Sequence, residues 1–148
     1  MKIEKEYDNI FRYVLYRTGN RYDAEDITQE TFLKYIEHTE YHGRGNERQL
    51  LYTIARNLCI DRRRKETTEI LPDDAQDRND DIIRKIAVRQ AMEHLLPEER
   101  EIIIMRLVNG ENISVIAKIF NTSRFTMSRR IKAITEKLKK ELGKEELI

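Results

Sequence analysis

A run of cations near the C-terminus is the feature of this sequence with the clearest chemistry. Residues 118–140 hold eight Lys or Arg and one acid, Glu136, whereas the whole chain of 148 residues carries a formal net charge of only +1. Cations concentrated in one segment of a nearly neutral protein form an electrostatic footprint for a polyanion such as DNA. A solvated helix face is the usual explanation of a charge run, but here the cations fall on the second helix of a two-helix motif.

A second group of cations lies close to aromatic side chains in the first half of the chain. Arg56 and residues 62–65 are basic, and Tyr41, His42 and Tyr52 are near them in the sequence. Cations interleaved with rings, beside a loop that contains glycine, suit single-stranded or unstacked DNA, whose bases stack on aromatic side chains. The competing interpretation is that Tyr52 belongs to the core and the Arg run is a solvated helix end.

No group of residues in the sequence supports catalysis or metal binding. The acids that come closest to such a site are Asp23, Glu25, Asp26 and Glu30. They occupy the first two turns of a predicted helix, where the helix dipole favours acids, and no His or Cys completes a ligand set. His38 and His42 are spaced four residues apart, but we expect the following glycines to end the helix between them. We therefore predict no enzymatic activity, no metal and no cofactor.

The C-terminal cations lie on a predicted helix-turn-helix. Two apolar stripes at helical spacing flank a polar break at residues 121–123. The stripes consist of Ile113, Ile116, Ala117 and Phe120, then Met127, Ile131, Ile134 and Leu138. We expect Asn121 to adopt the positive φ of the turn, and Ser123 or Thr122 to cap the second helix. The side chains that then face DNA are Arg124, Phe125, Thr126, Ser128, Arg129 and Lys132, with Arg130 turned partly toward the domain.

The remaining sequence predicts an all-α protein of two small domains. Residues 1–65 are expected to form a first domain of three or four helices, and residues 82–148 a second domain that contains the helix-turn-helix. Residues 66–81 carry seven acids, one Arg and Pro72, so we predict an extended acidic linker between them.

Several helix boundaries are predicted from single residues. Gly19 and Asn20 should end the first helix, and Asp23 should cap the second. Pro97 should begin a helix that continues to Asn109 and Gly110. The apolar positions that carry these helices are Ile10, Phe11, Val14 and Leu15; Ile27, Thr31, Phe32, Tyr35 and Ile36; Leu50, Leu51, Ile54, Ala55, Leu58 and Ile60; and Ile102, Ile103, Met105 and Leu107.

Composition places the chain among soluble, intracellular proteins. The single Cys59 cannot form an internal disulfide and suits a reducing cytoplasm. No apolar run approaches the roughly 20 residues of a membrane-spanning helix, and the first residues lack the order of a signal peptide. Five Gly and two Pro among 148 residues leave few helix breakers.

Three blocks of sequence resemble the extracytoplasmic-function (ECF) sigma factors of RNA polymerase. Residues 23–34 (DAEDITQETFLK) resemble the signature of conserved region 2, and residues 51–64 (LYTIARNLCIDRRR) resemble the next helix, which in that family faces the −10 promoter element. Residues 96–101 (LPEERE) and the helix-turn-helix resemble region 4, which recognises the −35 element. The blocks occur in the family's order and cover nearly the whole chain.

The resemblance implies a role for each block and two partners, core RNA polymerase and promoter DNA; it leaves an anti-sigma factor open. The residues implied in docking on the polymerase clamp are Asp23, Glu25, Asp26, Gln29, Glu30, Phe32 and Leu33. Those implied in holding the −10 strand are Tyr41, His42, Arg44, Asn46, Tyr52, Arg56, Asn57, Arg62 and Arg63. The six DNA-facing residues of the helix-turn-helix are implied in recognising the −35 element. Region 4 is also implied in contacting the polymerase flap.

The sequence departs from the family pattern at two places. Glu47 and Leu50 stand where the family often has an aromatic pair, and Ser123, Arg124 and Phe125 replace the usual Pro-x-Gly. Two other functions remain open. One is a stand-alone helix-turn-helix repressor with paired half-sites, and the other is a non-initiating adaptor built on a sigma-like fold.

Overall fold

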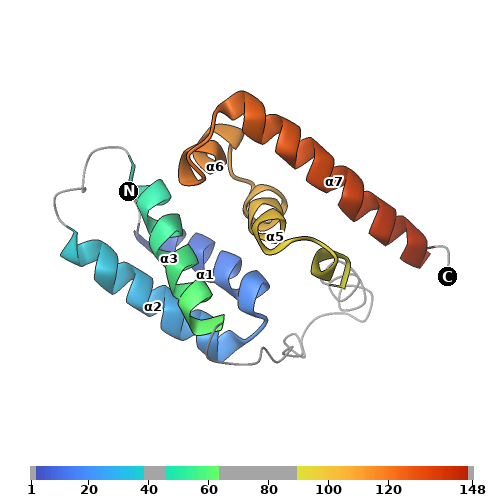
Figure 1. The fold of residues 1–148 in the computed structure, drawn as a ribbon. Coiled ribbons are helices and arrows are strands. Elements are labelled where there is room, and N and C mark those ends of the chain that lie inside the picture. The colour runs from blue at the N-terminus through green and yellow to red at the C-terminus, as the bar shows by residue number, and fades with distance from the viewer. Residues whose placement is uncertain (1–2, 39–45, 64–89, 147–148) are drawn as a thin grey trace.

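The computed structural model describes residues 3–38, 46–63 and 90–146, and every regular element in these ranges is a helix (Figure 1). The N-terminal domain consists of α1 (Ile3–Thr18), α2 (Arg21–Glu37) and α3 (Glu47–Arg63). The C-terminal domain contains α5 (Pro97–Ile103), the π-helix η2 (Ile104–Val108), α6 (Ile113–Ile119) and α7 (Arg124–Glu146). The predicted all-α class is confirmed. The predicted linker at 66–81 lies outside the described residues.

The three helices of the N-terminal domain pack against one another around Ile10, Val14 and Ile27. Gly19 has a φ of 71°, which ends α1 as predicted. The cap of α2 was predicted at the wrong residue. The side chain of Asn20, three positions before Asp23, caps α2 by accepting a hydrogen bond from the Asp23 N–H at 3.1 Å.

Helix α2 buries two polar side chains and exposes two large apolar ones. Thr28 and Thr31 are fully buried. Their hydroxyls can be buried because each donates a hydrogen bond to the backbone carbonyl one turn earlier in the helix, at 2.6 Å. Ile36, predicted to belong to the buried stripe, is 58% exposed, and the neighbouring Leu33 is 61% exposed. The helix therefore presents large apolar side chains on the outside of the N-terminal domain.

The helix that begins at Pro97 changes its geometry halfway. Pro97 opens α5 as predicted, and the Glu99 carboxylate accepts a hydrogen bond from the Leu96 N–H at 3.0 Å. From Ile104 the chain continues as the π-helix, with the Asn109 N–H bonded to the Ile104 carbonyl at 3.0 Å. The wider turn shifts the buried face, and Leu107, one of the apolar positions of the predicted helix, is 55% exposed.

The helix-turn-helix follows the prediction closely. Asn121 has a φ of 54°, and the Ser123 hydroxyl accepts a hydrogen bond from the Thr126 N–H at 3.1 Å. The predicted second stripe of Met127, Ile131, Ile134 and Leu138 is buried. That face of α7 packs on α5 and α6.

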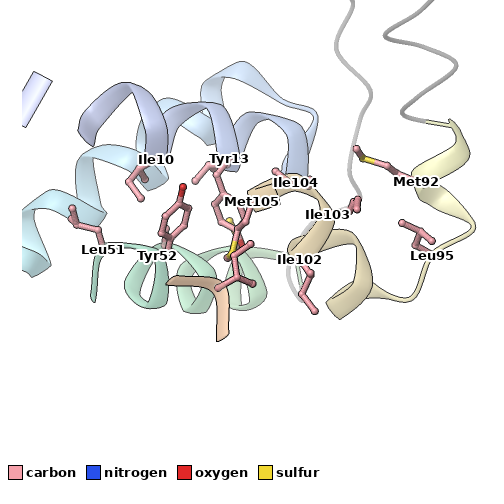
Figure 2. Packing of buried hydrophobic residues seen from close by; sticks show 14 of the residues in the cluster. Ile10, Tyr13, Leu51, Tyr52, Met92, Leu95, Ile102, Ile103, Ile104 and Met105 are labelled. Atoms are coloured by element: carbon pink, nitrogen blue, oxygen red, sulfur yellow. The ribbon is translucent and has the colours of Figure 1, made fainter. Parts of the chain in front are cut away.

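The two domains share one continuous core. Met105 of η2 lies beside Tyr13 of α1 and Tyr52 of α3, and all three side chains are fully buried (Figure 2). Helix α3 also packs against α6 and α1 against η2, so the C-terminal domain contacts the N-terminal domain through two of its elements. None of the described helices is long and apolar enough to cross a membrane.

Met105 offers a test of this shared core. Met105→Ala should lower the free energy of unfolding by about 2–5 kcal/mol, because it removes a fully buried side chain where the two domains meet. Leu107→Ala, two residues away in the same π-helix, should change it by less than about 0.5 kcal/mol, because Leu107 faces solvent. Urea denaturation followed by circular dichroism measures both. Equal effects of the two substitutions would contradict the buried position of Met105.

The single cysteine provides a second test. Burial raises the pKa of the Cys59 thiol to about 12, above that of an ordinary thiol. At pH 8 the thiolate, which is the reactive form, is therefore scarce in the native protein. We expect Cys59 to react with a thiol-specific chromogenic disulfide only as the protein unfolds in urea. A fast stoichiometric reaction without denaturant would contradict the burial of this side chain.

Candidate nucleic-acid interface

The outer face of α7 near its N-terminus carries the side chains predicted to face duplex DNA. All six of them are exposed: Arg124, Phe125, Thr126, Ser128, Arg129 and Lys132. The guanidinium carbon of Arg129 lies 5.8 Å from the centroid of the Phe125 ring, which is 72% exposed. The helix-turn-helix thus presents a basic surface with one exposed ring, opposite the stripe that α7 buries.

The cations of α7 divide into two groups by their partners. Arg130 pairs with Glu98 at 2.9 Å and Lys137 pairs with Glu99 at 2.8 Å, and both contacts hold α7 against α5. Among the described residues, no acid pairs with Arg124, Arg129 or Lys132. Their charge remains available to a polyanion, whereas that of Arg130 and Lys137 contributes to packing within the domain.

Tyr52, predicted to contact the −10 strand, is covered in this structure, and its contact with DNA stays a prediction. Tyr52 is fully buried, on the same face of α3 as Ala55 and Cys59. Its hydroxyl donates to Glu111 at 2.6 Å and accepts a hydrogen bond from the Asn109 amide at 2.6 Å. Burial and the Glu111 carboxylate raise the pKa of Tyr52 well above its ordinary value, so the phenol stays protonated as a donor. The C-terminal domain therefore covers the ring proposed for base stacking.

Arg56 is also engaged by the C-terminal domain. Its Nε atom lies 2.9 Å from Glu101 Oε2, and its guanidinium carbon lies 4.7 Å from the centroid of the Phe120 ring. Glu101 is buried and pairs in addition with Arg17 of α1. One buried carboxylate of α5 thus pairs with a cation from each of two N-terminal helices.

Other residues predicted to hold the −10 strand differ in exposure. Asn57 is exposed, and Asn46 is half-buried at the start of α3. Arg62 is half-buried and pairs with Asp23 at 3.0 Å and with Asp26 at 3.6 Å. Arg63 is the last residue of α3. Three of the predicted residues, Tyr41, His42 and Arg44, lie outside the described residues.

The predicted docking face on α2 is mixed in character. Glu25, Asp26 and Gln29 are exposed, and so is the apolar Leu33. The other three residues predicted for this face, Asp23, Glu30 and Phe32, are half-buried. The ring of Phe32 packs against Tyr7 of α1, with centroids 5.4 Å apart. An exposed surface of acids beside a large apolar side chain suits a protein partner better than DNA.

Sequence reasoning missed the residues through which the two domains meet. Glu101, Asn109 and Glu111 all contact the N-terminal domain, and none was singled out as functional. In the sequence, Glu101 falls in the block 96–101 that resembles region 4, and Glu111 lies outside every motif. Their partners lie about 45 to 100 positions away in the chain, so no local spacing could reveal them. In the described part of the chain no group of His, Cys, Asp or Glu could hold a metal ion.

Two family models match the chain, one in each half. The family model for sigma-70 region 2 matches residues 3–69, and that for sigma-70 region 4 matches residues 85–138. The ECF RNA polymerase sigma factor BldN of Streptomyces coelicolor is 32% identical over an alignment of 127 positions. That alignment covers 76% of this chain and 48% of BldN. The ECF sigma factor SigE of Mycolicibacterium smegmatis is 27% identical over an alignment of 155 positions. That alignment covers 96% of this chain and 60% of SigE. The chain thus matches about half to three fifths of the length of these two relatives.

A solved structure shares the fold. The sigma factor RpoE, crystallised with the anti-sigma factor NepR from Bartonella quintana, superposes with a TM-score of 0.73 at 19% identity, over 95% of this chain and 94% of RpoE. The arrangement of two helical domains is therefore common to both proteins. With both sigma-70 regions present in order and ECF sigma factors among its relatives, the chain belongs to the extracytoplasmic-function (ECF) sigma factor family.

Proposed function

We propose that this chain is a sigma factor that binds core RNA polymerase and directs promoter-specific transcription initiation. The observation that carries the proposal is the basic outer face of α7, whose three exposed cations Arg124, Arg129 and Lys132 have no acidic partner among the described residues. Membership of the ECF family supports the same function. Because sigma acts by binding, the proposal needs no catalytic residue, metal or cofactor in this chain.

The proposal gives the C-terminal domain one task and the N-terminal domain two. The N-terminal turns of α7 enter the major groove of the −35 element, where Arg129 can donate two hydrogen bonds to guanine. The basic end of α3 holds the opened −10 strand, and favourable contacts with unstacked bases offset the roughly few kcal/mol that each extrusion costs. The outer face of α2 docks on the polymerase clamp.

A transcription assay tests the function as a whole. Core RNA polymerase, alone or with this chain, transcribes a library of genomic fragments in vitro, and the 5′ ends of the products are sequenced. We expect start sites that appear only with the chain and share sequence near −10 and −35. If the chain co-purifies with no core subunit and yields no start sites of its own, it is not a sigma factor.

The recognition helix supplies a mutational test. Arg129→Ala should weaken initiation by about 1–3 kcal/mol and relax the preference at one −35 position, because it removes contacts to a base edge. Lys132→Ala should weaken it more evenly across sequences and reduce the salt slope by about one unit, because it removes a phosphate contact. Initiation by reconstituted holoenzyme on variant promoters measures both effects.

The matched control for these two variants is Lys139→Ala. Lys139 is an exposed cation of the same helix, seven residues beyond Lys132, and lies outside the predicted DNA face. Its removal changes the net charge by the same amount and should leave the base preference intact. If all three variants behave alike, α7 attracts DNA only by charge and does not recognise sequence.

The docking face supplies a separate test that does not involve DNA. Asp26→Lys should weaken binding to core polymerase while leaving the helix content unchanged, because Asp26 is exposed and its pair with Arg62 is long and solvated. Asp8→Lys, at an exposed position of α1, makes the same change in charge elsewhere. Co-purification with core and circular dichroism compare the two. Normal binding by Asp26→Lys would remove α2 from the docking role.

A further inference from the structure

Phe125 is a large apolar side chain that the fold leaves in water. It lies in the first turn of α7 with 72% of its surface exposed, and no other aromatic residue follows it in the sequence. By contrast, Phe120 is half-buried and contacts Arg56. Single exposed rings are common on protein surfaces, so the neighbours of Phe125 decide what this ring can do.

The neighbours of the Phe125 ring are cations. Arg124 precedes it in the chain, and the guanidinium carbon of Arg129 lies 5.8 Å from the ring centroid. Arg129 is four residues further along α7, so it lies on the same face of the helix, and both arginines are exposed. In the part of the chain that the structure describes, neither arginine has an acidic partner. The ring therefore lies within a surface that attracts a polyanion.

The first turn of α7 holds Phe125 in a defined place. The Ser123 hydroxyl accepts a hydrogen bond from the Thr126 N–H at 3.1 Å and donates one to the Thr126 hydroxyl at 2.9 Å. On the inner face of the same turn, Met127 is fully buried. A capped turn that is anchored on its inner side limits the directions in which Phe125 and Arg129 can leave the helix.

A phenyl ring can recognise only one feature of a base-pair edge in the major groove. It has no conventional hydrogen-bond donor or acceptor, so the polar groups that identify guanine, adenine and cytosine offer it no selective contact. Thymine presents an apolar group there, its C5 methyl, and phenylalanine is one of the side chains that contact it. A guanidinium beside the ring keeps its N–H donors for O6 and N7 of guanine.

We propose that Phe125 determines specificity at one position of the −35 element by contacting the C5 methyl group of a thymine near the guanine that Arg129 recognises. The proposal rests on the proposed function, because it takes the −35 role of α7 from there. It adds a second base preference, of a different chemical kind, and assigns it to a residue that stands where the family pattern has glycine.

Helix geometry limits the distance between the two bases. Four residues of an α-helix advance about 6 Å, whereas successive base pairs are about 3.4 Å apart. Side chains one turn apart therefore lie over base pairs that are about one or two steps apart. The thymine, on either strand, should lie within about two base pairs of the position at which Arg129→Ala relaxes the preference.

Uracil in place of thymine provides the test, because it removes the methyl group and keeps every hydrogen-bonding atom of the base pair. The −35 element is taken from the mapped start sites, and each of its A·T pairs is synthesised with thymine or with uracil. Competition against a fluorescent promoter duplex, followed by anisotropy, gives the relative affinities of reconstituted holoenzyme. The proteins compared are the wild type, Phe125→Ala, Phe125→Leu and the control Leu107→Ala, at an exposed apolar residue outside α7.

We expect uracil at one position to weaken binding by the wild-type holoenzyme about three- to fourfold, the factor that corresponds to burial of one methyl-sized group. Phe125→Ala should bind the thymine and uracil promoters equally, and Leu107→Ala should keep the wild-type ratio. Phe125→Leu retains an apolar side chain and should keep part of the ratio. Because each ratio compares two promoters with one protein, a general loss of affinity in a variant does not alter it.

The proposal is overturned if no A·T pair of the element is sensitive to uracil, or if Phe125→Ala keeps the wild-type ratio. A sensitive thymine far from the position that Arg129 recognises would also overturn it. If Phe125→Ala weakens binding equally for every −35 sequence, the ring contacts the sugar–phosphate backbone and not a base. None of these results touches the proposed function. That function fails if unmodified promoters yield no start sites, and the present proposal then fails with it.

Discussion

Two buried carboxylates, Glu101 and Glu111, determine how the halves of this protein are arranged. A carboxylate taken out of water is strongly destabilising unless cations and hydrogen-bond donors surround it. Arg17 and Arg56 surround the first, and Arg48 and Tyr52 the second. Because these partners come from α1 and α3, the C-terminal domain has one satisfactory orientation on the N-terminal domain. The apolar contact of Met105 with Tyr13 and Tyr52 adds buried surface between the domains, but apolar packing does not by itself select one orientation.

The π-helix is the local feature that makes this arrangement possible. Leu107 lies four residues after the buried Ile103, so a regular continuation of α5 would place both on one face. The wider turns of η2 instead expose Leu107, bury Ile104 and Met105, and bring the chain to Gly110, whose φ of 69° lets it reverse. Asn109 and Glu111 on either side of that glycine are thereby directed at α1 and α3. Such single π-turns are uncommon and often occur at functional positions.

The sequence predicts local structure well and the interdomain surface poorly, for one physical reason. Asn121 in the turn, Ser123 at the cap and the stripe from Met127 to Leu138 depend on neighbours within a few residues, so periodicity and capping rules found them. Tyr52 shows the limit: beside a basic helix end it was assigned to DNA, whereas it is buried under residues more than 50 positions away. The exposed face of α7 could be predicted because nothing distant covers it. The environment of Arg56 could not, because Glu101 and Phe120 are brought to it only by the fold.

Tyr52 is covered in the free chain, and the proposed function requires that the surface around it be uncovered when the chain binds core polymerase. Hydroxyl-radical footprinting of side chains, read by mass spectrometry, measures this directly, with the exposed Phe125 as an internal reference. Tyr52 and Met105 should oxidise slowly in the free chain, since both are fully buried. In complex with core polymerase and without promoter DNA, both should oxidise several times faster relative to Phe125. Equal protection of Tyr52 and Met105 in the two states would contradict the account, since the domains would then remain together on the enzyme.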